Sequence, residues 1–414
     1  MTEQPRTARA QVAFAALRHG SFRAYFATSA AAMMADNVEH VISYWVMFQK
    51  FHSPALAGFA VLIHWLPFLF FSVYFGALAD RYDCRRVIQF ALLLFMGVSL
   101  AWGLLFLTDT IEMWHAMVLL TVHGMAGVIW GPASQLLIHD IVGSEELQSA
   151  IRLSATSRYL GLLMGPAVGG GLMLLLGPPA GLLVNALIYL PLFLWLWKVP
   201  YDGHRRHVQG AQRRAAGLAD TVALLREVSD NRTIFSMILL AGVSSLFVGN
   251  AFQAQMPEYA HDLGTDEAGV RYTILLGANA AGALAGGLVL ESRGLLQARP
   301  QTAILFTVLW CLVVTGFAAA TNYPLAVALM FVAGFLNLAF SAMSQTLVQV
   351  HAPAQLRGRL IGLYNTANSG MRAFSGLTVG VLGSLIGVHW SLALSALALL
   401  AATLILWTFS MRTR

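Results

Sequence analysis

Long apolar runs separated by short polar or helix-breaking segments are the feature that most restricts this sequence. Twelve such runs can be read, each near or above the length of about 20 residues that a membrane-spanning helix needs. Hydrophobic residues make up 58% of the chain and charged residues only 11%, against about 25% charged in a typical soluble domain. We therefore expect an all-α membrane protein, because this composition fits a soluble enzyme or a disordered chain poorly. The predicted spans are 22–49, 55–79, 87–107, 113–139, 147–176, 180–198, 232–257, 268–290, 301–320, 324–350, 358–387 and 389–411.

The distribution of basic residues predicts the orientation of these spans. Twenty of the 25 Lys and Arg residues fall at the termini and in the loops of one side, and only Lys50 and Arg271 fall on the other. Such an excess marks the cytoplasmic side. We expect a multi-pass protein of a bacterial-type inner membrane with both termini in the cytoplasm. The net charge of +6 then reflects topology, and no nucleic-acid partner is expected.

One long polar connection divides the chain into two sets of six spans. It covers 199–231, which leaves an N-terminal bundle over 1–198 and a C-terminal bundle over 232–414. Four apolar residues recur in it at helical spacing, which predicts a short amphipathic helix on the inner membrane surface. A linker that only keeps the two halves together is the favoured interpretation of this segment, and contact with membrane lipids is an addition to it. They are Leu218, Val222, Leu225 and Val228.

Two sequence matches relate the halves to each other. Residues 124–135 read G-(x)9-S-Q and residues 334–345 repeat that pattern, while 76–80 read G-(x)3-D and 287–291 read G-(x)3-E. Parallel repeats of this kind are related by an axis along the membrane normal. Two such bundles can open to alternate sides of the membrane around a site between them.

The loop between spans two and three reads GALADRYDCRRV over residues 76–87. It resembles G-x-L-A-D-R-x-G-R-R, the signature of the major facilitator superfamily. The resemblance implies 12 helices in two pseudo-symmetric six-helix bundles, and a transporter of small molecules. Asp83 stands where the signature has glycine, so the turn there is expected to differ; a basic loop that only sets topology is the alternative. In the family this loop latches the outward-facing state, a role that falls here on Gly76, Asp80, Arg81 and Arg85.

Span five carries a second pattern, G-x(3)-G-P-x(2)-G-G, over residues 161–170. Small residues at four-residue spacing let helices approach closely, and a proline weakens the helix. The pattern resembles one found in proton-coupled exporters of the same superfamily, with close packing alone as the alternative. The arginine that drug exporters carry in span four is missing, since residues 121–124 read TVHG. The predicted hinge or packing residues are Gly161, Gly165, Pro166, Gly169 and Gly170.

A third stretch narrows the resemblance. Residues 353–370, read together with 21–23, are similar to the bacterial subfamily that includes the enterobactin exporter. This resemblance implies a siderophore-like or amphiphilic drug-like substrate.

Ionisable residues inside the predicted spans are functional candidates because charge is costly in hydrocarbon. Asp36 lies about 21 Å along span one from its start, and Glu39 and His40 share its helix face. Asp36 and Glu39 are predicted to couple transport to protons. Arg158 and Arg372 lie at similar depth in spans five and eleven, where either could pair with the acids or with an anionic substrate. A fixed ion-pair network is the alternative.

Other polar residues of the spans could line a cavity between the halves, or could form ordinary interhelical hydrogen bonds. His64 and His123 are more typical of packing histidines than of functional ones. The predicted lining residues are Asn37, His40, His123, Asn250, Gln253, Asn337, Asn365 and Asn368.

Several common functional motifs are missing from the sequence. There is no G-x(4)-G-K-[ST], no H-E-x-x-H and no G-x-S-x-G, and the two cysteines lie in different halves. We therefore predict no enzyme activity, cofactor or metal, and a proton gradient as the energy source. The sequence favours a proton-coupled exporter that works by alternating access, and the family resemblance implies a monomer. An importer or uniporter is the first alternative, and a receptor or scaffold without transport is the second.

Overall fold

The computed structural model describes residues 14–204, 224–264, 269–293, 299–353 and 356–411, and the regular elements in these ranges are all helices. The predicted all-α fold is confirmed. Nine helical stretches in this part of the chain are long and apolar enough to cross a membrane. The first span is not among the nine, which agrees with the acidic residues that it carries. The count of twelve stays a prediction.

The N-terminal half contains one very long helical run in which two glycines turn the chain. Gly143 has φ 75° and Gly177 has φ 78°, backbone angles that glycine adopts at little cost. The three predicted spans between 113 and 198 therefore follow one another almost without loops. The helices are η1 (Ala15–Arg18), α1 (Gly20–Phe51), α2 (Pro54–Arg81), α3 (Cys84–Leu107), α4 (Met113–Ile188) and α5 (Leu190–Lys198).

Two predicted spans of the C-terminal half are not continuous α-helices. The predicted span 232–257 breaks after Phe247, where Gly249 has φ 46°. The predicted span 358–387 contains two π-helical segments, and beside them the Thr378 hydroxyl donates to the Phe247 carbonyl at 2.8 Å. The elements are α7 (Arg232–Phe247), α8 (Ala251–Ala254), α9 (Met256–Asp262), α10 (Val270–Arg293), α11 (Pro300–Ala318), α12 (Tyr323–His351), α13 (Arg357–Asn365), η2 (Thr366–Gly370), α14 (Arg372–Ser375), η3 (Gly376–Val381), α15 (Leu382–Ile386) and α16 (Val388–Met411).

The end of the long connection packs on the C-terminal half. Leu224 and Val228 are buried against Ile234 and Met237 of α7. A protein core therefore covers Val228, and a membrane-surface role for this segment stays a prediction. Leu218 and Val222 lie outside the described residues.

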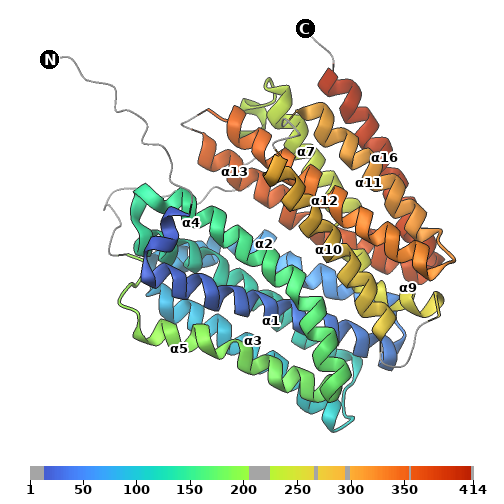
Figure 1. The fold of residues 1–414 in the computed structure, drawn as a ribbon, viewed down its shortest axis with the longest axis horizontal. Coiled ribbons are helices and arrows are strands. Elements are labelled where there is room, and N and C mark those ends of the chain that lie inside the picture. Colours follow the sequence, from blue (N-terminus) through green and yellow to red (C-terminus); the bar gives the residue numbers. More distant parts are fainter. Residues whose placement is uncertain (1–13, 205–223, 265–268, 294–298, 354–355, 412–414) are drawn as a thin grey trace.

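The two halves repeat one helix contact, as the matching segments predict. A Cβ atom built on Gly124 would collide with the Ile63 carbonyl of α2, and one built on Gly334 would collide with the Asn279 carbonyl of α10. Both glycines therefore permit the same close approach, between the second and fourth spans of each half. Figure 1 shows α1–α5 as one group of helices and α7–α16 as another.

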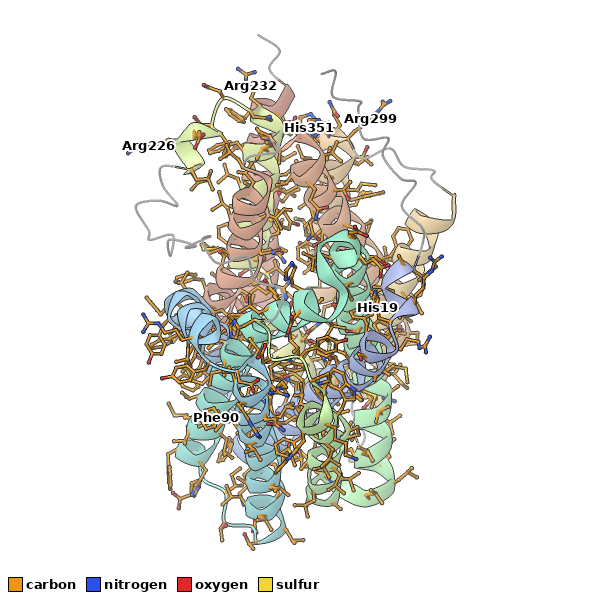
Figure 2. All side chains as sticks on the ribbon, turned by 90° about the vertical axis from the view of Figure 1, so that its left-hand side faces the viewer. His19, Phe90, Arg226, Arg232, Arg299 and His351 are labelled. Carbon is orange, nitrogen blue, oxygen red and sulfur yellow. The ribbon has the colours of Figure 1, made fainter. Side chains whose placement is uncertain are left out.

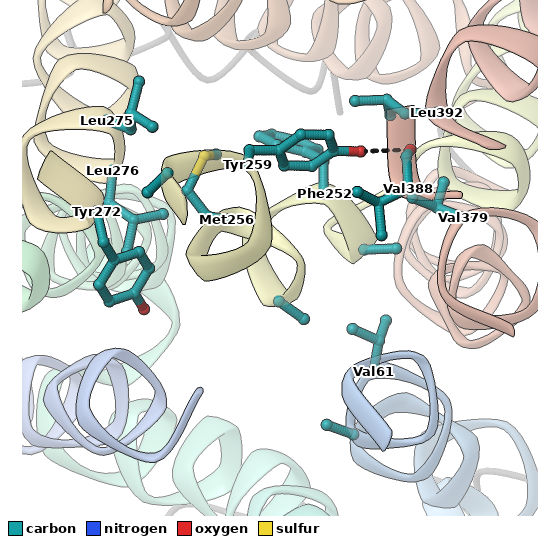
Figure 3. Close-up of a cluster of buried hydrophobic side chains, with 14 of the residues drawn as sticks. Val61, Phe252, Met256, Tyr259, Tyr272, Leu275, Leu276, Val379, Val388 and Leu392 are labelled. Atoms are coloured by element: carbon teal, nitrogen blue, oxygen red, sulfur yellow. Dashed lines mark hydrogen bonds between the residues drawn. The ribbon is translucent and has the colours of Figure 1, made fainter. Parts of the chain in front are cut away.

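Among the described residues, the hydrophobic core joins the halves at one face. We call the face with residues 82–83, 199–204 and 352–353 the basic face, and the face with turns 52–53 and 319–322 the opposite face. Toward the basic face each half has a core cluster of its own. Toward the opposite face a single cluster contains residues of both halves, and Figure 3 shows part of it, with Val61 of α2 across from Phe252 and Val379. Figure 2 labels Arg226, Arg232, Arg299 and His351 over the C-terminal half on the basic face.

Polar and backbone contacts seal the same opposite face. The Tyr272 hydroxyl of α10 donates to the Val41 carbonyl of α1 at 3.0 Å, and Gln255 donates to the Pro54 carbonyl at 2.8 Å. The backbone of α2 at Gly58 packs directly on the backbone of η3 at Gly376. The structure is therefore closed on the opposite face, and the described contacts between halves lie there or at mid-depth.

We expect Gly58→Val to prevent this closure, because its side chain would meet backbone atoms that cannot rotate away. Overpacking of this kind costs about 1–3 kcal/mol, which corresponds to about a 5–150-fold shift in population. Spin labels on cysteines placed at the exposed residues Lys50 and Trp390 would report the shift as a longer distance. Gly97→Val is the matched control, since no described atom lies within 4 Å of a Cβ there. Equal distances in both variants would contradict the expectation.

Candidate functional site

Two acidic side chains of α1 share one buried histidine of α4. Nδ1 of His123 lies 2.7 Å from a carboxylate oxygen of Glu39, and its Nε2 lies 2.8 Å from a carboxylate oxygen of Asp36. The side chain of His123 is 2% exposed, that of Glu39 4% and that of Asp36 19%. The α-helical spacing of three residues places both acids on the face that meets α4. Asp36 is thus the most exposed side chain of the three, and the one best placed to exchange a proton with its surroundings.

Two uncharged side chains hold Glu39 from its other side. Ser99 of α3 donates to the second carboxylate oxygen of Glu39, and Asn185 of α4 donates to the Ser99 hydroxyl at 3.1 Å. Ser99 and Asn185 were not predicted. Asn185 could have been predicted, because it is an amide within the apolar run of span six. Ser99 could not, because serines are common inside membrane spans.

The hydrogen-bond geometry requires protons between the three side chains. Each of the two N···O contacts needs one proton, so with both carboxylates otherwise ionised Asp36, Glu39 and His123 share two protons and carry one net negative charge. Loss of one proton would leave two buried negative charges facing a neutral ring, which is costly in apolar surroundings. A further proton would neutralise the cluster. Its charge therefore changes by one unit with each proton exchanged.

Two more histidines lie beside this cluster. Nδ1 of His40 lies 2.7 Å from the Asp36 carbonyl oxygen, to which it can only donate. The ring of His40 meets those of His64 and His123 edge-on at 4.9 and 4.7 Å between centroids. Nδ1 of His64 is buried without a hydrogen-bond partner among the described residues.

The glycines of span five provide the surface against which α1 packs. Cβ atoms built on Gly161 and Gly165 would collide with Met33 and Asn37, and one on Gly169 would crowd Val41. Gly170 faces Thr273 of the C-terminal half, and Pro166 is buried within the helix. The close packing predicted for this motif is therefore present. It holds α1, with its two acids, directly against span five.

In the described ion pairs the two acids contact His123, and Arg372 is not among their partners. Arg372 lies over the Trp65 ring of α2, 5.0 Å from its centroid, and the two acids pair with His123. The reason is geometric, because α4 brings an imidazole between the acids. The side chain of Arg158 lies outside the described part of the structure.

The predicted amides are scattered. Asn37 donates to the Met33 carbonyl of its own helix at 2.8 Å, and the Ser245 hydroxyl lies 2.7 Å from the backbone carbonyl of Asn368 and 3.4 Å from its side-chain oxygen. Asn365 is exposed, whereas Asn250, Gln253 and Asn337 are half-buried in the C-terminal half. In the contacts of the described residues, none of the predicted amides bonds to the acid–histidine cluster.

The signature loop is held within the N-terminal half. Asp83 caps α3 by accepting from the Arg85 backbone at 2.9 Å and pairs with the Arg85 guanidinium, which also donates to the Val199 carbonyl at 2.6 Å. Partial burial opposes ionisation of Asp83, but the hydrogen bonds from Arg85 outweigh it and hold the pKa of Asp83 below its usual value. The residue that departs from the signature thus has a defined role. Its φ of −54° needs no glycine.

Two of the other latch residues make few contacts in this conformation. Arg81 is exposed, and no described atom lies within 4 Å of a Cβ built at Gly76. The reason is that the halves meet at the opposite face. The side chain of Asp80 lies outside the described residues.

Comparisons with known proteins agree with this architecture. Macrolide efflux protein A of Streptococcus pyogenes is 22% identical over 379 residues, which cover 90% of this chain and 91% of that protein. The staphyloferrin A transporter of Staphylococcus aureus is 22% identical over 191 residues, or 44% of this chain and 48% of that protein. Among solved structures, an inward-facing bacterial homologue of the human lysosomal transporter Spinster has a TM-score of 0.74 at 13% identity, over 94% of this chain and 96% of that one. The nucleoside transporter NupG has a TM-score of 0.72 at 13% identity, over 95% of this chain and 100% of that one.

The chain is a multi-pass membrane transporter of the major facilitator superfamily, whose members are not enzymes. Residues 11–414 match the family described as transmembrane secretion effector, and the chain belongs to that family. The family resemblance read from the signature loop is confirmed.

We expect Asp83→Ala to lower the thermal stability, since loss of an N-cap costs about 0.5–2 kcal/mol. The folded-state pKa of Asp83 is lowered, so its contribution is present above its ordinary pKa and disappears as the pH falls through the lowered value. Unfolding midpoints in detergent at several pH values would test this. Asp230→Ala, at an exposed acid, serves as control. A variant difference that persists at the lowest pH would argue against the cap.

We expect His123→Leu to destabilise the protein by about 3–5 kcal/mol, because both acids lose their buried partner. Adding Asp36→Asn and Glu39→Gln to that variant should restore most of the loss. The measurement is the unfolding midpoint of each purified variant, with His351→Leu as control. If the triple variant is no more stable than His123→Leu, the loss of stability does not come from the two acids losing their partner.

Proposed function

We propose that this protein is a proton-coupled exporter of a small amphiphilic organic molecule, of a siderophore-like or drug-like kind. The observation that carries the proposal is the His123 bridge between Asp36 and Glu39, a buried group whose charge changes by one unit per proton. The names of the relatives, which include macrolide efflux protein and staphyloferrin A transporter, support export and these substrate classes.

The position of the cluster on α1 supports coupling between proton binding and conformation. Val41, whose carbonyl accepts from Tyr272 across the halves, lies two residues from Glu39. Trp45, one turn further on, stacks on the Tyr272 ring at 5.7 Å. A change of charge at Asp36 or Glu39 therefore acts on the same helix that seals the opposite face.

A transport cycle follows from these parts. With the basic face on the cytoplasmic side, as the arginine distribution favours, the described conformation is closed on the side away from the cytoplasm, and in the proposed cycle it receives substrate from the cytoplasm. Opening of the opposite face would release substrate outward and expose Asp36 to protons from outside. Return to the described state would release the proton inward. We place the protein in a bacterial inner membrane with cytoplasmic termini, and expect it to act as a monomer.

The proposal is tested in proteoliposomes that contain a pH-sensitive dye. A macrolide, a siderophore and a lipophilic cation are added in turn under an imposed proton gradient, and both substrate and proton movement are recorded. We expect one class of compound to move against the proton flow. Asp36→Asn should reduce the coupled proton flux to that of empty liposomes, because the neutral amide cannot exchange a proton.

The matched control is Asp109→Asn, which removes a carboxylate that is 84% exposed and pairs with Lys50. Substrate movement without proton flux would indicate a uniporter, and movement in the same direction as the protons would indicate an importer. If neither substrate nor protons move and the accessibility of the two faces does not change, the result would favour a receptor or scaffold. Any of these three outcomes would overturn the proposal.

A further inference from the structure

Three histidines from three different helices converge next to the acid pair. His40 comes from α1, His64 from α2 and His123 from α4, and one ring nitrogen of each lies within 4.8 Å of the others. No local sequence pattern indicates this group, because the three residues are far apart in the chain. Only the packing of α2 and α4 through Gly124 brings them together.

We propose that His40, His64 and His123 bind a divalent transition metal ion of the Zn²⁺ type, with Asp36 as a fourth ligand. Imidazole nitrogens suit Zn²⁺, Co²⁺ and related ions, and three histidines with one carboxylate make a tetrahedral set. Ca²⁺ requires six to eight oxygen ligands and Mg²⁺ an octahedral set rich in oxygen and water, which this group does not supply.

The hydrogen bonds around the rings orient the required nitrogens. His40 donates through Nδ1 to the Asp36 carbonyl, so its Nε2 carries a free lone pair. Nδ1 of His123 faces Glu39, which leaves Nε2 for the ion, and Ser99 holds Glu39 in turn. Ligating histidines commonly donate their second nitrogen to a carboxylate or a backbone carbonyl in this way.

His64 completes the site without breaking any contact. Its Nδ1 is buried and makes no hydrogen bond among the described residues, so packing alone leaves it unsatisfied. Bonds of about 2.0–2.1 Å to a tetrahedral ion bring nitrogens about 3.4 Å apart. The rings therefore need only a small inward rotation from their present separation. The ion would take the place of the proton between Nε2 of His123 and Asp36, which lie 2.8 Å apart.

Metal binding to this site would stop proton exchange at Asp36, because ion and proton use the same nitrogen. The site itself does not depend on export, and a binding measurement on purified protein is therefore independent of any transport assay. Failure of metal binding would leave the proposed function intact, and failure of transport would leave the site intact.

The test uses the full chain purified in detergent with an affinity tag that contains no histidine, and stripped with a chelator. Co²⁺ is added first, because tetrahedral Co²⁺ has intense visible absorption bands, and Zn²⁺ binding is then measured by calorimetry. We expect one ion per protein, with tetrahedral Co²⁺ bands that Zn²⁺ removes. His64→Ala should weaken binding by at least about tenfold. This variant leaves the His123 bridge in place, so it should fold as the wild type does.

Two control variants locate the ion. His351→Ala removes a histidine whose Nδ1 bonds the carbonyl four residues earlier, as His40 does, and should bind as the wild type does. His389→Ala removes a histidine that pairs with Asp262 at the opposite face, and it too should leave binding unchanged. No binding by the wild type, equal binding by His64→Ala, or loss of binding in His389→Ala would each overturn the proposal.

Discussion

A single imidazole between two carboxylates is the interaction on which the rest of this structure depends. Without His123, α1 would carry two like charges into an apolar bundle, and burial of such charges costs several kcal/mol each. The contact requires α1 to lie close to the first part of α4, which carries His123, and the glycines of span five let the later part of α4 pack closely on α1 as well. The polar centre and the small-residue packing are thus parts of one arrangement.

Much of the fold follows from local sequence signals, and the exceptions have a tertiary cause. Apolar runs and breakers predicted most helix ends within a few residues, including the turn at Gly177, and the paired glycines Gly124 and Gly334 predicted equivalent contacts in both halves. The break after Phe247 and the π-helical segments of span eleven were missed. A bond between Thr378 and the Phe247 carbonyl, 131 residues apart, joins the two irregular segments, and no local pattern shows such a contact.

Only the charged residues of the site could be predicted from the sequence. Asp36 and Glu39 stood out because acids are rare in apolar runs, and their shared face followed from helical spacing. For His123, their partner, the sequence favours a packing role, because this residue lies 84 and 87 residues further along the chain among ordinary apolar residues. Arg372 was expected near the acids on depth alone, but depth does not fix the direction of a side chain, and the structure places it over Trp65.

The segment that follows α5 has a consequence for the order in which the molecule assembles. Its backbone closes over the signature loop, where Cys84 donates to Asp202 at 2.8 Å and Gly203 donates to the Asp140 carboxylate at 3.0 Å. The two acids, His123 and these two hydrogen bonds all belong to the first 204 residues. During synthesis the N-terminal bundle can therefore complete its buried polar centre before the second bundle leaves the ribosome, and the later half docks onto a finished partner.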